Sequence, residues 1–311
     1  MNRRFFFCLP ALALIFLVCT APTFAAEPDP YLDFAFARRL FEQGDYFRAV
    51  TEAKRFLFLY PDHPRRNEAW LLIARSYMSS GQYQEARRAF EPVIAQKDQP
   101  DLAAEAALEL GRCLERLSPV DEAVTYYQEL IDRPPVAGPW ADDVRNQARY
   151  RLGWLFLREG RWLEAQAVFG QVESGHRLWP SARELAQTAP KGANIDLKSP
   201  AAAGVLSAVL PGAGQVYVGR PVDAGLAFGL NAAFLLGAVE AYNNESWAVF
   251  SLLGLMEIAW YGGNIYNAVN GAHIHNREAR RNFLNRLEQE HGWRLGWTRK
   301  GPALVWSWAI E

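Results

Sequence analysis

A six-residue turn, Gly-Asp-Tyr-Phe-Arg-Ala at residues 44–49, decides the fold of this chain, because variants of it return three times. They are Gly-Gln-Tyr-Gln-Glu-Ala at 81–86, Ser-Pro-Val-Asp-Glu-Ala at 118–123 and Gly-Arg-Trp-Leu-Glu-Ala at 160–165, at spacings of 37, 37 and 42 residues. A period of this length is typical of supersecondary units that bury their apolar faces only by stacking on one another. The spacing predicts an array of about four repeats over residues 31–185.

Apolar residues recur at helical spacing on both sides of each turn, so we expect one helix before it and one after it. Small residues upstream of the turn allow the first helix to approach the second closely, and glycine accepts the positive φ that the reversal requires. Aromatic residues downstream then fill the gap between the helices. The positions that define the repeat are Gly44, Tyr46, Ala49, Trp70, Ala74, Tyr77, Gly81, Tyr83, Ala86, Gly111, Ala123, Gly153, Gly160, Trp162 and Ala165.

This pattern resembles the tetratricopeptide repeat, and several positions coincide in four copies. The resemblance implies an all-α solenoid of helical hairpins with a concave face that binds protein partners. The linker Phe-Leu-Phe-Leu-Tyr-Pro-Asp-His-Pro at 56–64 is similar to linkers of periplasmic repeat proteins in Gram-negative bacteria. Those proteins include the lipoprotein component of β-barrel assembly and the coordinator protein of the Tol-Pal system, so the likeness implies a scaffold of the cell envelope.

The first 25 residues are typical of a secretory signal peptide. Arg3 and Arg4 precede an apolar run at 5–18, and small residues follow before an acidic start. Cys19 does not fit a lipoprotein signal, because the bulky Val18 stands where such signals favour a small residue. After cleavage the chain keeps a single cysteine, Cys113, in a helical apolar pattern, so we expect a buried thiol and no internal disulfide.

The composition changes beyond a polar linker at residues 186–198. The segment 199–272 holds hardly any charge and contains three apolar runs, at 199–219, 222–242 and 246–269. The two later runs are long enough to cross a hydrocarbon core, whereas the first is marginal and is interrupted by Pro211 and Gly212. The segment therefore predicts a membrane module of two or three helices, bound to lipid.

The first run carries a recognisable motif at residues 210–220, Leu-Pro-Gly-Ala-Gly-Gln-Val-Tyr-Val-Gly-Arg. It resembles the Pro-Gly-x-Gly-Gln-x-Tyr-x-Gly signature of small bacterial modules with two or three membrane segments, which have no agreed biochemical role. The glycine spacing is not that of a nucleotide-binding loop. The motif residues are Pro211, Gly212, Gly214, Gln215, Tyr217 and Gly219.

Charge around the runs favours three crossings over two. The loop at 242–245 has no basic residue, whereas four arginines follow the last run, and basic flanks stay in the cytoplasm. An exported repeat array and a cytoplasmic basic flank together require three crossings. Small residues that recur every fourth place predict a helix-packing seam, more simply within the chain than between copies. They are Gly225, Gly229, Ala233, Gly237 and Ala241.

Polar residues inside the third run are candidate functional positions, because an intramembrane carboxyl is energetically costly. Glu257 shares a helical face with Asn264, and Asn267 lies beside that face. Hydrogen bonding between helices accounts for them more simply than ion or proton handling, which stays open. In the remaining tail, 273–311, an amphipathic helix is expected at 275–291 and a β-hairpin between 293–297 and 303–310.

The sequence favours a non-enzymatic protein. Lys and Arg number 33 against 34 Asp and Glu, which argues against a nucleic-acid binder. No catalytic, cofactor or metal motif occurs, and His63 and His176 are expected to be isolated and solvated. We therefore expect a scaffold in the inner membrane of a Gram-negative bacterium, with periplasmic repeats that bind a protein partner. The alternative is a subunit of a membrane transport or protein-insertion complex in which the membrane module is the working part.

Overall fold

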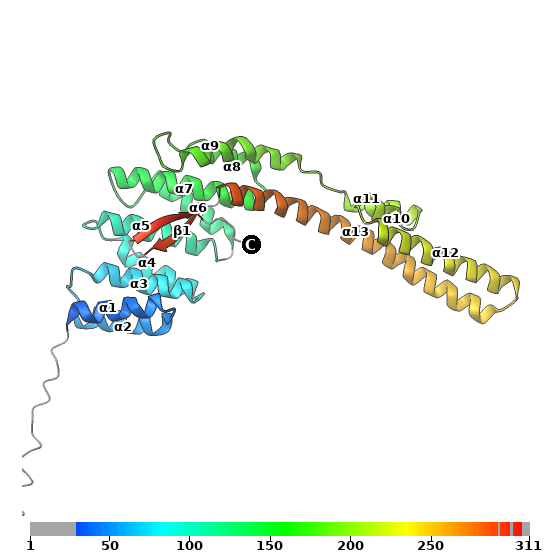
Figure 1. Ribbon diagram of the computed structural model, residues 1–311, viewed down its shortest axis with the longest axis horizontal. Coiled ribbons are helices and arrows are strands. Elements are labelled where there is room, and N and C mark those ends of the chain that lie inside the picture. Colours follow the sequence, from blue (N-terminus) through cyan, green and yellow to red (C-terminus); the bar gives the residue numbers. More distant parts are fainter. Residues whose placement is uncertain (1–28, 118, 292, 299–300, 307–311) are drawn as a thin grey trace, which may run out of the picture. The chain divides into compact units, whose positions relative to one another are not determined.

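The structure is a computed structural model that describes residues 29–117, 119–291, 293–298 and 301–306. The predicted signal peptide, Ser118 and the end of the predicted C-terminal hairpin lie outside the described residues. The chain separates into two compact units, one up to Leu117 and one from Ser118 onward. Figure 1 labels the elements along both units.

The first unit consists of two antiparallel helix pairs followed by a fifth helix. Gly44 and Gly81 occupy the left-handed region at φ +80° and +78° and reverse the chain between the members of a pair, as predicted. The first helix of the second pair contacts both the first helix of the first pair and the fifth helix, so these three helices lie side by side and form one face of the unit. The helices are α1 (Pro30–Glu42), α2 (Tyr46–Leu59), α3 (Arg66–Ser79), α4 (Tyr83–Ile94) and α5 (Pro100–Leu114).

The second unit continues the array and then becomes apolar. Its elements are α6 (Val120–Asp132), α7 (Pro139–Arg158), α8 (Trp162–Phe169), α9 (Trp179–Thr188), the 3-10 helix η1 (Ala189–Asn194), α10 (Pro200–Val209), α11 (Ala213–Tyr217), α12 (Pro221–Asn243), α13 (Trp247–His291), β1 (Trp293–Thr298) and β2 (Gly301–Trp306). The helices α1 to α8 fall at the four predicted repeats, which confirms the all-α solenoid. Helix α9 and η1 pack on α8, so the irregular link is shorter than the predicted 186–198.

The predicted contact between small and aromatic residues is seen most directly in the fourth repeat. A Cβ added to Gly153 on α7 would lie 2.6 Å from the ring of Phe169 on α8. Ala49, Ala86, Ala123 and Ala165, which follow the four turns, are all fully buried. The spacing of small residues therefore sets how closely the two helices of a repeat approach.

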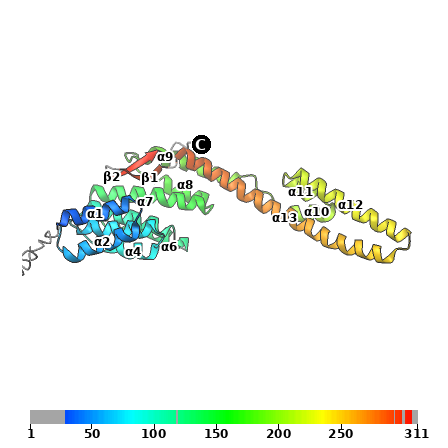
Figure 2. The ribbon, with the colours of Figure 1, turned by 60° about the horizontal axis from the view of Figure 1, so that its bottom comes forward.

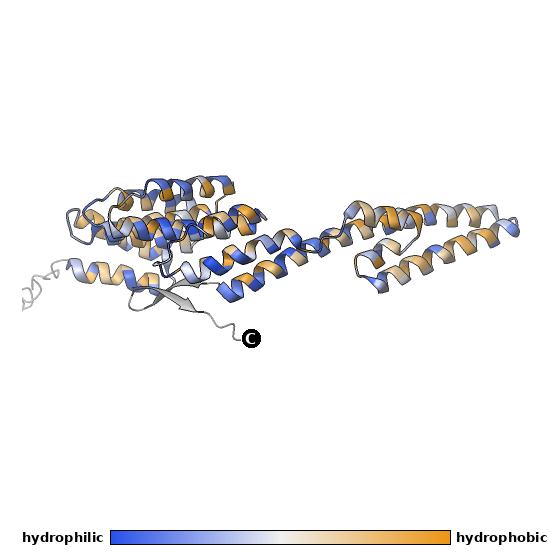
Figure 3. Cartoon of the chain, turned by 90° about the horizontal axis from the view of Figure 1, so that it is seen from above, coloured by the Kyte–Doolittle hydropathy of each residue, from blue (hydrophilic) through white to orange (hydrophobic). Residues whose placement is uncertain are grey.

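Helices α12 and α13 form an apolar hairpin, coloured mostly orange to pale in Figure 3. Among the described residues they are the two helices long and apolar enough to cross a membrane. The first apolar run does not form a third such helix. It divides into the ten-residue α10 and the five-residue α11, and α10 rises only about 15 Å, half of a hydrocarbon core. The turn at Pro211 and Gly212 is the physical reason, so the described residues contain two helices of crossing length and not the three that the preferred arrangement requires.

Helix α13 is a single helix of 45 residues, drawn without interruption in Figures 1 and 2. The boundary expected near residue 272, between the membrane module and the amphipathic helix, is therefore not a break in structure. The far end of α13 packs on the last repeat. Phe283 meets Trp162 edge-to-face at 5.5 Å, and Tyr150 Oη donates to the carbonyl oxygen of His291 at 3.0 Å. The repeat position Trp162 thus contacts the end of α13.

The predicted seam of small residues is only partly correct. Gly225, Gly229 and Ala233 are exposed, and a Cβ at either glycine would meet nothing within 4 Å. Gly237 alone of the three glycines approaches α13, with Leu253 Cδ1 3.2 Å from its added Cβ. The buried residues of α12 are Ala224, Ala227 and Asn231, which lie outside the predicted seam, and Ala241, which belongs to it. At the chain's end, β1 and β2 pair antiparallel, with Trp293 opposite Trp306.

The close approach at Gly153 gives a stability prediction. Gly153→Ala should lower the free energy of unfolding by about 1–3 kcal/mol, because the buried ring of Phe169 has to move to admit a methyl group. Thermal unfolding of the detergent-solubilised chain, followed by circular dichroism, measures the change. Gly175→Ala is the control, because an added Cβ there meets nothing within 4 Å. Equal stability of the two variants would contradict the proposed packing role.

Candidate functional site

The first helices of the repeats carry a buried ion-pair cluster in the first unit. Arg75 on α3 lies 2.5 Å from Glu105 and 3.0 Å from Glu109, both on α5. Burial lowers the pKa of Arg75, but the two carboxylates outweigh it and raise the pKa above its ordinary value. Burial raises the pKa of Glu105 despite the arginine. One guanidinium thus pairs with two carboxylates and ties α3 to α5, so the cluster joins successive repeats.

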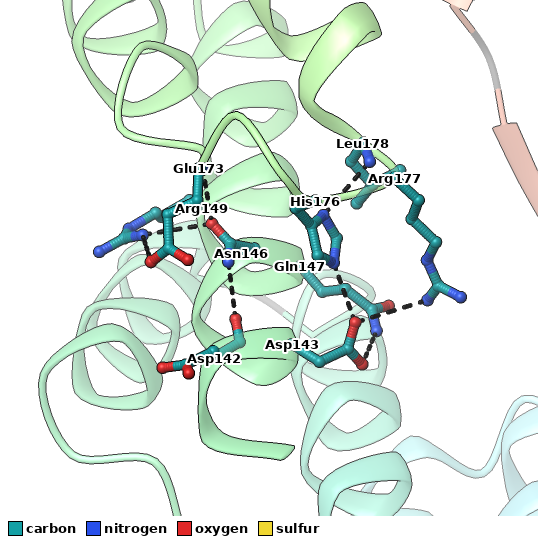
Figure 4. Close-up of polar contacts among 9 residues, drawn as sticks. All are labelled: Asp142, Asp143, Asn146, Gln147, Arg149, Glu173, His176, Arg177 and Leu178. Atoms are coloured by element: carbon teal, nitrogen blue, oxygen red, sulfur yellow. Dashed lines mark hydrogen bonds and ion pairs between the residues drawn. The ribbon is translucent and has the colours of Figure 1, made fainter. Parts of the chain in front are cut away.

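A second polar cluster joins α7 to the loop before α9 (Figure 4). His176 Nδ1 accepts from the backbone N–H of Leu178, so its proton is on Nε2, which donates to Asp143 at 2.9 Å. Gln147 donates to the other carboxylate oxygen at 2.7 Å, and Arg177 lies 3.9 Å from the carboxylate. Burial raises the pKa of Asp143, but the hydrogen bonds and the charge of Arg177 outweigh it, so the pKa falls below its ordinary value.

The same cluster fixes the neighbouring loop through Asn146. Asn146 donates to the backbone oxygen of Asp142 at 2.8 Å and accepts from the backbone N–H of Glu173 at 3.0 Å. His176 is therefore neither isolated nor solvated, contrary to the sequence prediction, because it closes the fourth repeat. His63 is not isolated either, because its Nδ1 accepts a hydrogen bond from the backbone N–H of Arg65 and its ring packs against Phe56.

Cys113 lies where the sequence places it, in the core. Its side chain is fully buried, and its thiol donates to the backbone oxygen of Tyr83 at 3.2 Å. Burial raises the pKa of the thiol to about 11, so it stays protonated at neutral pH. The thiol is therefore unreactive and fills space between repeats.

The glycine motif of the apolar module is a site of close backbone packing. Gly212 adopts φ +93°, and a Cβ there would lie 2.5 Å from the backbone oxygen of Ala224 on α12. A Cβ on Gly214 would collide with the backbone oxygen of Ala203, with the hydroxyl of Ser207, and with Ala268 at 2.8 Å. The two glycines therefore allow α11 to lie against α10, α12 and α13 at once.

Hydrogen bonds inside this packing run in one direction. The backbone N–H of Gly214 donates to Ser207 Oγ at 3.1 Å, so the Ser207 hydroxyl donates onward to Gln215 Oε1 at 2.9 Å. The amide nitrogen of Gln215 then donates to Asn264 Oδ1 at 2.6 Å and to its backbone oxygen at 3.0 Å. The motif residue Gln215 thus connects α10 to α13, and Asn264 acts as a link between helices.

The remaining motif residues, and the other polar residues predicted inside the third apolar run, lie around this chain of donors. Tyr217 Oη accepts from the backbone N–H of Ser199, and Gly219 turns the chain at φ +80°. Asn267 accepts from Arg220 at 3.3 Å. Glu257 lies about two turns before Asn264 on α13, where its Oε2 is buried without a hydrogen-bond partner among the described residues. The structure therefore brings Gln215 and Asn264 into contact and leaves Glu257 apart from them.

A cavity of about 580 Å³ opens beside this network, between α12 and α13. Gln215, Asp223, Asn264 and Asn267 form its polar part. Its apolar part includes Leu226, Phe234, Met256 and Trp260. The volume lies in the range of small-ligand pockets. In the described part of the chain, no group of three or more His, Cys, Asp or Glu side chains could hold a metal ion.

Comparison with known proteins supports the repeats. Residues 71–137 match one family model described as tetratricopeptide repeat, and residues 147–174 match a second model of the same description. The chain therefore contains tetratricopeptide repeats, which generally serve protein–protein interaction. The first helix pair and the apolar hairpin lie outside both matched ranges. No curated protein matches the chain.

Two crystal structures of the TPR-like repeats of a putative kinesin light chain from Podosopora anserina are similar to this chain. They are 21% and 20% identical to it, cover 53% of it, and have 86% and 89% of their own chains covered. The TM-score is 0.40 for both. These figures say nothing of function.

Sequence reasoning missed two features of these sites. The sequence does not indicate that Ser207 bonds to Gln215. A serine in an apolar run is common, and Gln215 lies beyond a turn. The cluster around Asp143 was missed because it joins a helix to a loop 33 residues away. A carboxylate and a histidine on either side of a predicted repeat turn are a signal that could have found it.

The polar cluster predicts a pH-dependent stability. Asp143→Asn should lower the free energy of unfolding at pH 7 by about 1 kcal/mol, because it weakens the hydrogen bond from His176. Since the folded-state pKa of Asp143 is depressed, its stabilisation is present above the unfolded pKa of about 3.9. It is lost as the pH falls through the lower folded value.

Chemical unfolding at pH 7 and below pH 4 measures the effect, and the two proteins should converge in acid. Asp142→Asn is the matched control, because that carboxylate is 60% exposed and pairs with Arg145 on the helix surface. A constant difference between wild type and Asp143→Asn at all pH values would contradict the assignment.

Proposed function

We propose that the chain is a non-enzymatic scaffold of a bacterial cell envelope. Its repeats bind a protein partner in the periplasm, and the α12–α13 hairpin anchors them in the inner membrane. In this arrangement a signal peptide at 1–25 is cleaved, the repeats span residues 31–185, and the membrane module begins at residue 199. The hairpin crosses the bilayer twice.

The outward exposure of the apolar side chains carries the proposal. Only 17% of the apolar window of α12 and 6% of that of α13 is buried. The core helix of a water-soluble protein would have most of such a window buried, whereas here Leu236, Ile258 and Leu255 are each about 70% exposed. Side chains of this kind are stable against hydrocarbon and costly in water.

Both ends of a two-crossing hairpin lie on one side of the membrane. The end of α13 contacts the last repeat through Phe283 and His291, so the repeats share that side. The arginines between residues 277 and 286 then lie there too, against the usual preference of basic flanks for the cytoplasm. The signal peptide is synthesised first and usually dominates orientation, which supports a periplasmic location.

Exposed aromatic side chains on the first repeat support a protein partner. Phe58 and Phe47 on α2 are 84% and 81% exposed, the highest values among the large apolar side chains of the described residues. They are three helical turns apart and so lie on one face of α2. Aromatic residues of this kind supply much of the binding energy at protein interfaces.

Cysteine labelling tests the topology. Single cysteines placed at Asn244, in the turn of the hairpin, and at Arg280, beyond its apolar part, are treated in intact cells with a reagent that does not cross the inner membrane. We expect labelling at 280 and none at 244 until the cells are lysed. Labelling of both positions in intact cells, or recovery of the chain in the soluble fraction without detergent, would overturn the membrane part.

Photo-crosslinking tests the partner. A photoreactive phenylalanine at position 58 of the full chain should form a discrete adduct with one periplasmic protein in living cells. The same group at Leu163, which is 69% exposed on α8, is the control for random collision. An identical adduct pattern at both positions, or no adduct at 58, would contradict a partner site on the first repeat.

A further inference from the structure

A stripe of exposed polar and cationic side chains runs along α13 where its apolar run ends. Its residues follow one another at steps of three or four, so they lie on one face of the helix. All of them are exposed, and the tyrosine at the start of the stripe is 72% exposed. The stripe consists of Tyr266, Asn270, His273, Arg277 and Arg281.

The opposite face of this part of α13 is covered by the rest of the chain. Asn276 exchanges two hydrogen bonds with the backbone of Lys198, at 2.7 and 2.8 Å. Ala272 is fully buried, and a Cβ on Gly271 would lie 3.1 Å from the side chain of Val218. The stripe is therefore the face of α13 that the described residues leave open.

The cations of the stripe have no carboxylate partner within the described part of the chain. Arg277, Arg281 and the neighbouring Arg280 are all exposed, and none of them forms an ion pair there. Glu278 is the only acidic residue between positions 273 and 281, and it lies about 100° round the helix from Arg277. Three arginines against one glutamate leave this segment with a net positive charge.

Other cations at this end of the apolar hairpin are paired within the chain. Lys198 lies 3.0 Å from the carboxylate of Asp196, and Arg220 lies 2.6 Å from that of Asp223. Both are therefore largely neutralised by a neighbour. The positive charge that is left for an external partner is concentrated on the stripe.

The stripe begins at the level where hydrocarbon gives way to headgroups. The apolar run ends near residue 269, and headgroups extend roughly 5–8 Å beyond the hydrocarbon on each side. Along the helix axis, Arg277 lies roughly 12 Å beyond residue 269. Side chains lean toward the N-terminus of a helix, which is the lipid end of this part of α13. A long arginine side chain therefore brings its charge to the headgroups, and Tyr266 suits the same interface.

We propose that the stripe, together with Arg280, binds the anionic headgroups of membrane phospholipids. The planar guanidinium group presents N–H donors in a fork that matches the oxygens of a phosphate. A basic residue beside a membrane span strengthens the attraction to an anionic surface by roughly fivefold. A zwitterionic headgroup carries its own ammonium group, so it gains much less. The inference rests on the proposed function, because it requires the hairpin to lie in lipid.

Lipid titration of the full chain tests the proposal. The chain is purified in detergent, depleted of lipid, and titrated with phosphatidylglycerol or phosphatidylethanolamine under native mass spectrometry. Wild type should bind the anionic lipid at least tenfold more tightly than the zwitterionic one. Arg277→Gln should reduce this preference by about fivefold. The triple variant Arg277→Gln/Arg280→Gln/Arg281→Gln should abolish it, and all three positions are exposed, so the fold should be unaffected.

Arg286→Gln is the matched control. Arg286 is exposed on the same helix but lies roughly 25 Å beyond residue 269, out of reach of the headgroups. Its removal should leave the preference unchanged. Glycerophosphoglycerol, the same headgroup without acyl chains, should not compete with the lipid. In living cells, a photoreactive phenylalanine in place of His273 should form adducts with phospholipid.

Four results would overturn the inference. They are equal affinity of wild type for the two lipids, equal losses in Arg277→Gln and Arg286→Gln, competition by glycerophosphoglycerol, and a discrete protein adduct at position 273. The third would assign the arginines to a soluble anion, and the fourth would assign the stripe to an acidic protein or a second copy of the chain. Failure of the proposed function is separate, because the labelling of positions 244 and 280 reports insertion of the hairpin whichever lipid is preferred.

Discussion

Close approach of helices at positions without a side chain is the constraint on which both parts of this chain depend. In the fourth repeat the absent Cβ of Gly153 gives space to the ring of Phe169. In the apolar module the absent Cβ of Gly214 lets its own N–H reach Ser207 and brings α10 against α13. In the first case the result is tight apolar packing, and in the second it is a buried hydrogen-bond network.

The network at Gly214 matters because a buried donor or acceptor costs most where water is absent. Ser207, Gln215 and Asn264 satisfy one another in series, and the series has a direction fixed by a backbone N–H at one end. The series ends at two acceptors, the side-chain and backbone oxygens of Asn264, so it joins α10, α11 and α13 through buried polar groups.

Much of the repeat array could be predicted because its signals are local. Gly44, Gly81 and Gly160 turn the chain through positive φ, and the alanine after each turn is buried, as the sequence indicates. The errors concern relations between distant residues. Hydropathy identified residues 199–219 as one apolar run but did not show that the turn at Pro211 and Gly212 divides it into two helices. Gly225 and Gly229 have the spacing of a packing seam but are exposed, so spacing alone does not decide which face of a helix packs. The pairing of His176 with Asp143 depends on how the fourth repeat closes, which no local pattern contains.

The continuity of α13 has a mechanical consequence. Roughly 33 Å of rigid helix separates the end of its apolar run, near residue 269, from His291 at the last repeat. A helix transmits orientation as well as distance, because each residue turns the chain by about 100°. The number of residues in this stretch therefore sets both the distance between the last repeat and the apolar hairpin and the direction in which that repeat faces. A flexible tether of equal length would fix the distance only loosely and would not fix the direction.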